Sequence, residues 1–274
     1  MPQSVYKTEK INDHITKISE SFIVNCYLIE GTERAILLDC GTGVGNINEF
    51  VKTLTDKPFS LVATHAHVDH IGGVRNFNKM YINAVDIPII LWSTSNFIRS
   101  GYLREHPGAK HFDFDYTKIK KSHKPFLVIP FCDGHIFDLG GGVKVKAYRV
   151  PGHTRGSCFF KMKNEDIIFT GDTFIQFLHL CYHYPASLLT WTKDYELLKK
   201  VGSGCTLYPS HGRHAVPWEA LEWQYKKAKE IIASTEKNSS VFKKEKIKVT
   251  NPDHPHLSIF YRSEYVYPFL KRNR

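Results

Sequence analysis

The stretch Thr64-His65-Ala66-His67-Val68-Asp69-His70-Ile71-Gly72-Gly73 places three histidines and one aspartate within six residues. It follows the short, partly β-branched apolar run Ser60-Leu61-Val62-Ala63, which predicts a buried strand. The ligand-type residues therefore come where a strand ends and a loop begins, the usual place for chemistry in α/β folds. If the strand continues to His67, residues two apart point to the same side, so His65 and His67 can bind one metal ion. Asp69 and His70 can then turn toward a second ion.

Neutral imidazoles combined with a carboxylate suit zinc first, with iron or manganese as alternatives. A histidine-rich surface loop, or core histidines bonded to the backbone, would give the same local pattern. The choice between these interpretations depends on whether ligand-type residues also occur elsewhere in the chain.

Three such residues follow strand-like runs further along. They occur in Pro151-Gly152-His153-Thr154, Phe169-Thr170-Gly171-Asp172-Thr173 and Pro209-Ser210-His211-Gly212. An upstream turn, Leu37-Leu38-Asp39-Cys40-Gly41-Thr42-Gly43, places an aspartate after another apolar run. In this order, across residues 37 to 212, the motifs resemble those of the metallo-β-lactamase superfamily, in which the turn at Asp39 would be structural.

The resemblance implies a cofactor of two divalent metal ions and a role for each residue. One ion would be bound by His65, His67 and His153, the other by Asp69, His70 and His211, and Asp172 would bridge the two. The implied fold class is α/β: an αββα four-layer sandwich of two mixed β-sheets with helices outside.

The two halves of the chain also repeat one plan, independently of the resemblance. Residues 26–39 and 158–172 each have the pattern of a hairpin that ends in an aspartate. Helical patterns at 46–54 and 192–201 follow, and each leads to a strand ending in a histidine, His65 or His211. Two hairpins can look alike by chance, but a duplication would give two facing sheets with helices outside.

Because the ligand motifs extend over most of the chain, we predict one hydrolase domain over residues 1–274. Two aromatic-rich segments, near 77–125 and 174–192, are not needed to bind metal. Both adjoin metal motifs, so we predict that they are pocket-forming insertions, with simple core packing as the alternative. A further helix is predicted over 218–235, and His254 and His256 are predicted to be surface or packing residues.

The amino-acid composition indicates the cellular compartment and the kind of partner that the chain binds. The net charge is +10, from 37 Lys and Arg against 27 Asp and Glu, which favours an anionic partner such as a phosphate-bearing substrate or a nucleic acid. The six cysteines are widely spaced, as in a protein with reduced thiols, which predicts a cytoplasmic location. We expect neither a signal peptide nor a membrane span.

Two metal ions can share a water and lower its pKa, giving a hydroxide that attacks an electrophilic carbon or phosphorus. We assign Asp69 a catalytic role as well as metal binding, because it can orient that water or accept its proton. Arg155 could contact an anionic substrate or form a structural salt bridge.

The glyoxalase II and lactonase branches of the superfamily share the complete ligand set, and the run Pro151-Gly152-His153-Thr154-Arg155-Gly156-Ser157 resembles the acyl-CoA thioesterase branch. The run 152–157 lacks the second histidine that the first two branches carry, and Ile175 replaces a lactonase-type tyrosine. These differences favour a small-molecule thioester over a lactone. A β-lactamase is an alternative, although such enzymes generally lack the residue corresponding to Asp172. A ribonuclease Z-like phosphodiesterase and a non-catalytic binding protein are the others.

Overall fold

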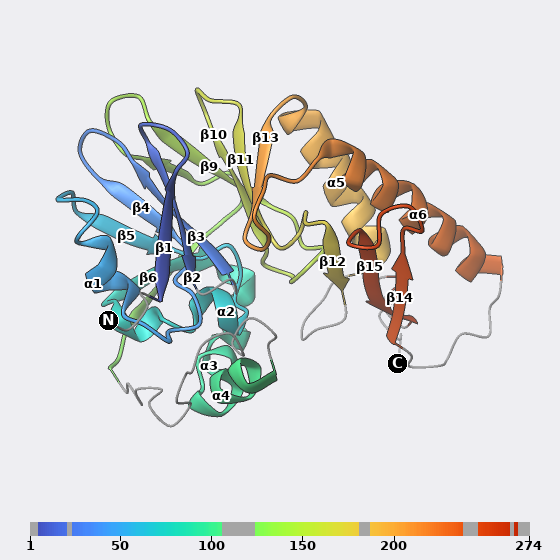
Figure 1. Cartoon of the computed structure of the whole chain (residues 1–274), viewed down its shortest axis with the longest axis horizontal. Helices are drawn as coiled ribbons and strands as arrows, with labels where there is room; N and C mark the ends of the chain where they lie inside the picture. Colours follow the sequence, from blue (N-terminus) through green and yellow to red (C-terminus); the bar gives the residue numbers. More distant parts are fainter. Residues whose placement is uncertain are drawn as a thin grey trace.

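Two β-sheets lie face to face with helices on their outer sides (Figure 1). They are seen in a computed structural model that describes residues 5–20, 24–105, 124–180, 187–237, 246–263 and 266–267. The predicted αββα architecture is confirmed. Among the described residues, no helix combines the length and apolar character needed to span a bilayer.

The first half of the chain forms a seven-stranded sheet whose strands follow in chain order. They are β1 (Tyr6–Lys10), β2 (Ile15–Glu20), β3 (Val24–Glu30), β4 (Ala35–Leu38), β5 (Phe59–Val62), β6 (Lys79–Asn83) and β7 (Leu127–Phe131). Strands β1 to β4 pair antiparallel, and β4 to β7 pair parallel. The sheet is therefore mixed, as predicted.

The second half forms a five-stranded sheet of order β13-β11-β10-β9-β8. Its strands are β8 (Ile136–Asp138), β9 (Lys144–Arg149), β10 (Cys158–Met162), β11 (Ile167–Gly171) and β13 (Thr206–Pro209). A third sheet, of three strands, comprises β12 (Phe177–Leu180), β15 (Ser258–Arg262) and β14 (Lys246–Thr250). This separate sheet was not predicted from the sequence.

The helices are short in the first half of the chain and long in the second. They are α1 (Ile47–Val51), α2 (Val68–Ile71), α3 (Ile90–Ser93), α4 (Asn96–Glu105), α5 (Leu188–Gly202) and α6 (Trp218–Lys237), with 3-10 helices η1 (Val74–Asn76) and η2 (Ala84–Ile89). The three predicted helices correspond to α1, α5 and α6. Helix α5 begins earlier than predicted because the Ser187 hydroxyl accepts a hydrogen bond from the Thr190 amide and caps it.

The repeat in the sequence is also present in the structure. Strands β3 and β4 form an antiparallel hairpin, α1 follows, and β5 returns parallel to β4. Strands β10 and β11 form the equivalent hairpin, α5 follows, and β13 returns parallel to β11. Each unit thus ends its last strand just before the ligand-type residues.

Apolar side chains from both sheets fill the space between them. One buried cluster joins Ile29 and Leu38 of the first sheet to Phe160 and Phe169 of the second. Tyr27 crosses this layer: its ring centroid lies 4.8 Å from that of Phe169, and its hydroxyl donates to the Pro209 carbonyl at 2.6 Å. The packing holds the ends of β5, β11 and β13 close together.

One buried carboxylate predicts a pH dependence of stability. Glu20 is fully buried at the end of β2, where its Oε2 accepts a hydrogen bond from the Thr42 amide at 2.6 Å. Burial raises the pKa of Glu20 to about 7, from 4.5 in the unfolded chain. The folded protein therefore binds the proton more tightly, so this stabilising contribution is complete below pH 4.5 and is lost as the pH rises from 4.5 to about 7. The loss is on the order of 3 kcal/mol.

We expect Glu20→Gln to remove this dependence, because an amide cannot ionise. The measurement is the melting temperature of both proteins from pH 5 to pH 9. The variant should gain stability relative to the wild type as the pH rises from 5 to about 7, whatever its offset at pH 5, and the difference should stay constant at higher pH. Parallel curves would show that Glu20 does not titrate in this range.

Candidate metal centre

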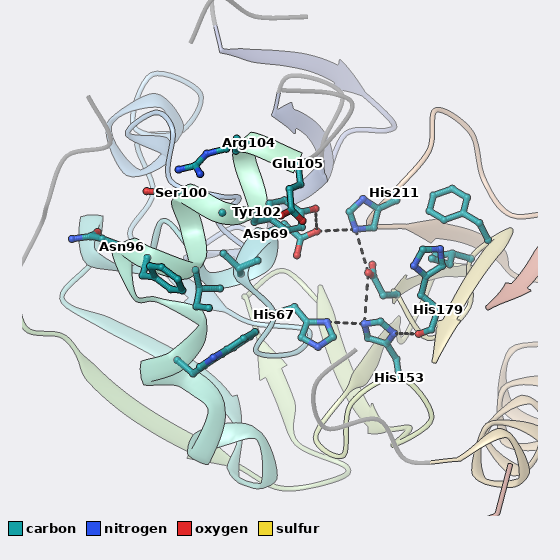
Figure 2. A pocket seen from close by; sticks show the side chains of 18 residues that line it. His67, Asp69, Asn96, Ser100, Tyr102, Arg104, Glu105, His153, His179 and His211 are labelled. Carbon is teal, nitrogen blue, oxygen red and sulfur yellow. Dashed lines mark hydrogen bonds and ion pairs between the residues drawn. The ribbon is translucent and has the colours of Figure 1, made fainter. Parts of the chain in front are cut away.

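Seven side chains from both halves of the chain converge at one end of the sandwich. Figure 2 labels His67, Asp69, His153 and His211 from this set. They come from the loop after β5, from α2, and from the loops after β9, β11 and β13. Their ligand atoms form three groups, each with all atoms within 4.8 Å: His65, His67 and His153; His65, His70 and Asp172; and Asp69, His70 and His211. The structure brings together all the residues that the sequence predicted as ligands.

The two first histidines do not approach each other in the way that strand alternation suggested. Strand β5 ends at Val62, before either residue, and His67 is the N-cap of α2. The His65 Nε2 and His67 Nδ1 atoms nevertheless lie 3.1 Å apart. The loop geometry, with different nitrogens of the two rings, brings them together.

The hydrogen bonds of two histidines fix which nitrogen faces the centre. His153 Nδ1 donates to the His179 carbonyl at 2.8 Å, which leaves the lone pair of the neutral ring on Nε2. The Thr64 hydroxyl donates to Asp39, so it accepts from His65 Nδ1 and leaves that lone pair on Nε2 as well. His153 Nε2 lies 2.9 Å from His67 Nδ1. Three ring nitrogens thus converge on one point, as in a three-histidine metal site.

His70 also directs its Nε2 atom toward the centre, in the group that it forms with Asp69 and His211. Its Nδ1 donates to the Asp39 carboxylate at 2.8 Å, and its Nε2 has no hydrogen-bond partner among the described residues although it is fully buried. Buried nitrogens are rarely left unpaired in proteins. A metal ion is the partner that such a lone pair fits.

Asp172 lies between the group formed by His65, His67 and His153 and the group formed by Asp69, His70 and His211. Its Oδ2 is 3.2 Å from His211 Nε2, 3.5 Å from His70 Nε2 and 3.8 Å from His153 Nε2. Its other oxygen, Oδ1, is buried without a hydrogen-bond partner among the described residues. Asp69 Oδ2 also lies 3.2 Å from His211 Nε2. The donor set therefore fits the divalent metal binding that this fold implies.

Electrostatics divides the centre into two parts. Burial and the neighbouring imidazoles lower the pKa of His65, and burial lowers the pKa of His153 to about 3. Burial also acts to lower the pKa of His70 and His211, but the carboxylates of Asp172 and Asp69 outweigh it. They raise the pKa of His70 well above its usual value and that of His211 to about 10. The carboxylates thus attract positive charge to their side of the centre.

Asp39 holds three loops of the centre together. Its Oδ1 accepts from the Thr64 amide at 2.7 Å, and its Oδ2 accepts from the Thr64 hydroxyl, His70 Nδ1 and the Ser210 hydroxyl. It adopts a φ of 63°, a conformation that costs energy for residues other than glycine. The structural role that the sequence resemblance implied for this turn is confirmed.

Two buried aspartates near the centre were not identified from the sequence. Asp86 of η2 accepts hydrogen bonds from the Ala66 amide, the Thr154 hydroxyl and the Gly156 amide, and so ties the first loop to the third. Asp194 of α5 accepts from the Gly152 amide at 2.6 Å, and burial raises its pKa to about 8. The one available signal for Asp86 was an acidic residue inside the apolar run 84–91.

A cavity of about 780 Å³ opens directly onto the centre. Its floor includes His67, Asp69, His153, Asp172 and His211. Its walls come from both aromatic-rich segments, with Trp92, Phe97, Ile98 and Tyr102 from the first and Ile175, Phe177 and His179 from the second. Figure 2 shows His179 beside His211, across the centre from Tyr102.

For one residue of these segments, the prediction of a pocket wall is wrong. Trp191, expected among the pocket walls, is fully buried in the core, where its ring lies 6.1 Å from that of Phe174 and its Nε1 donates to the Thr173 carbonyl. The alternative interpretation, simple core packing, is correct for Trp191 because this residue is on the inner face of α5. The expected aromatic residues of 106–123 and 181–186 lie outside the described residues.

Arg155 is exposed and is not among the residues that line the cavity. Its carbonyl accepts a hydrogen bond from Arg149 Nε at 2.9 Å. The geometry gives no support to a contact between Arg155 and the substrate.

Comparisons with known proteins agree with this geometry. The family model described as "Metallo-beta-lactamase superfamily" matches residues 20–222. The curated protein "Acyl-coenzyme A thioesterase MBLAC2" of Bos taurus is 26% identical over 225 residues, which cover 72% of this chain and 74% of that protein.

Two solved structures are similar in fold. The metallo-beta-lactamase from Pontibacter korlensis has a TM-score of 0.59 at 17% identity, covering 81% of this chain and 97% of its own. The structure of TTHA1623 "in a di-iron-bound form" has a TM-score of 0.51 at 21% identity, covering 70% of this chain and 89% of its own. At these identities the likeness concerns the fold alone.

Proposed function

Because this chain belongs to the metallo-β-lactamase superfamily and is a metal-dependent hydrolase, we propose that it hydrolyses thioesters of the acyl-CoA type through a dinuclear centre. The observation that carries the proposal is the cavity of about 780 Å³, which has the metal-ligand residues as its floor and apolar side chains as its walls. A cavity of this size and lining is typical of a small-molecule site.

We assign the seven residues to two ions. His65, His67 and His153 would hold one ion, Asp69, His70 and His211 would hold the other, and Asp172 would contribute to both. The inward lone pairs of the imidazoles and the central position of Asp172 Oδ2 support this division. Zinc is the first choice for such nitrogen and oxygen ligands, and the di-iron form of TTHA1623 makes iron the main alternative.

Two ions bound there would supply a water of lowered pKa and a positive charge for the carbonyl oxygen of the substrate. Asp69 faces the cavity and is the group that orients this water and takes its proton. The water oxygen bonds to the carbonyl carbon, and the carbon–sulfur bond breaks with its electron pair on sulfur. The proton taken by Asp69 passes to that sulfur, so the products are a carboxylic acid and a thiol. The apolar walls hold the acyl group beside the centre and exclude other water.

Three features favour a thioester among the substrates of the superfamily. The relative from Bos taurus is named as an acyl-coenzyme A thioesterase. Ile175, at the position where the sequence lacks a lactonase-type tyrosine, lines the cavity as an apolar wall. The net charge of +10 suits an anionic carrier, and Arg104 contributes a cationic side chain to the lining.

A cytoplasmic location remains part of the proposal. Cys26, Cys40, Cys158 and Cys205 are buried free thiols, which suit a reducing compartment.

A substrate screen with metal-reconstituted protein tests the assignment. We expect kcat/KM for acyl-CoA to exceed that for lactones, β-lactams and RNA, with thiol release that stops after chelation and returns with zinc. Hydrolysis of RNA faster than of any thioester would contradict the proposal and favour the phosphodiesterase. Equal rates in chelated and reconstituted protein would contradict the metal-dependent step.

A further inference from the structure

The hydroxyl of Tyr102 contacts the centre from a helix that carries no metal ligand. Tyr102 lies on α4, within the first aromatic-rich segment, and its Oη donates to Asp69 Oδ2 at 2.7 Å. The same oxygen of Asp69 lies 3.2 Å from His211 Nε2 and is the atom that faces the second group of ligands. Figure 2 shows the phenol hydroxyl and the imidazole on either side of the Asp69 carboxylate.

The position of α4 is fixed by a second polar link, one turn before Tyr102. Arg99, only 3% exposed, donates from Nε to the Thr42 carbonyl at 2.9 Å and from Nη2 to the Gly43 carbonyl at 2.8 Å. Residues three apart share a helix face, so Arg99 and Tyr102 point toward the same part of the molecule. The loop that Arg99 holds is itself bonded to α2, through the Cys40 amide and the His70 carbonyl.

The Asp69 carboxylate is also close to other ionisable groups of the centre. Asp69 is 6% exposed and lies on α2, a helix of four residues. Its charge is close to that of Asp172, which repels it, and His70 and His211 attract it. A donor on the cavity side therefore restricts the rotation of the Asp69 side chain and keeps its Oδ2 directed at the centre.

We propose that Tyr102 is a positioning residue that orients the Asp69 carboxylate toward the second metal ion and the attacking water. Helix α4 then links the pocket wall to the catalytic carboxylate. It contributes Phe97 and Ile98 to the cavity, and its Tyr102 donates to Asp69. This rests on the proposed function, because it assigns Asp69 its role there. The effect of the hydroxyl on metal affinity can still be measured if the substrate assignment fails.

The test compares Tyr102→Phe with the wild type, since this change removes only the hydroxyl and keeps the ring in the pocket wall. Zinc affinity is measured by competition with a chromophoric chelator, and kcat and KM are measured separately with an acyl-CoA. We expect a fall of about 10- to 100-fold in the affinity for one of the two zinc ions or in kcat, as for other residues that orient a metal ligand. KM should change less than about threefold, because the apolar contacts remain.

Two controls separate positioning from a general structural effect. Tyr225→Phe removes a tyrosine–carboxylate hydrogen bond of 2.6 Å to Glu196, on the outer helices, and should change neither quantity. Asp69→Asn should lower zinc affinity itself, and adding Tyr102→Phe to it should lower the affinity little further, because the two act through one contact. Unchanged affinity and kcat in Tyr102→Phe, or an equal further loss in the Asp69→Asn background, would overturn the proposal. A rise in KM alone would also overturn it, by showing a direct contact with substrate.

Discussion

Replacing Asp172 by asparagine is expected to lower kcat about 1000-fold and to reduce the bound metal below two ions per chain. The carboxylate lies within 3.8 Å of ligand nitrogens from both groups, so its charge serves both ions. Loss of well-placed metal charge at the carbonyl oxygen costs several kcal/mol, and about 4 kcal/mol corresponds to three powers of ten in rate. The measurements are metal content by elemental analysis and kcat on an acyl-CoA substrate.

A matched variant shows that the effect belongs to the centre. Asp138→Asn changes the same functional group on β8, where the carboxylate forms an exposed ion pair with Lys144, and should leave metal content and kcat unaltered. Far-UV circular dichroism should show that Asp172→Asn keeps the fold, because the interior between the sheets is unchanged. Wild-type metal content and rate in Asp172→Asn would show that this residue does not bridge the ions.

The second large effect concerns the acyl chain. We expect kcat/KM to rise about fourfold for each added methylene, up to the length that fills the cavity, because burying one methylene contributes about 0.8 kcal/mol. Phe97 and Phe177 line the cavity and are 86% and 36% exposed, so a long chain can cover them. Phe97→Ala and Phe177→Ala should each reduce the rise for longer chains without loss of metal.

The choice of variants follows from the structure. Trp191→Ala is unsuitable, since that side chain is in the core and its removal is expected to cost about 3–5 kcal/mol of stability. Leu127→Ala is a suitable control, because Leu127 is 69% exposed on β7 and does not line the cavity. If kcat/KM of the wild type does not depend on acyl chain length, the cavity is not an acyl pocket. Metal-dependent hydrolysis would then act on another class of substrate.

The repeated pattern in the two halves of the sequence indicated two facing sheets with helices outside, and the family resemblance implied the four-layer αββα arrangement. The hairpins at 26–39 and 158–172 show apolar runs followed by an aspartate, and each run forms a strand because apolar residues on both faces can be buried between layers. Helix α6 was predicted from the regular spacing of its apolar residues. The small sheet of β12, β14 and β15 was not, because β12 joins it by pairing with β15 across about 80 positions of the chain.

The sequence by itself determined which side chains could meet at the centre. The seven lie in short motifs that come after the apolar runs of β5, β9, β11 and β13, and the order of these motifs carries the family resemblance. Only the tertiary structure decided how those side chains are held. Asp86 reaches Thr154 across 68 positions and Tyr102 reaches Asp69 across 33, and both contacts depend on how η2 and α4 pack against the loops. A hydrogen bond between distant residues has no local pattern, because its geometry is set by the packing of elements and not by the spacing of residues along the chain.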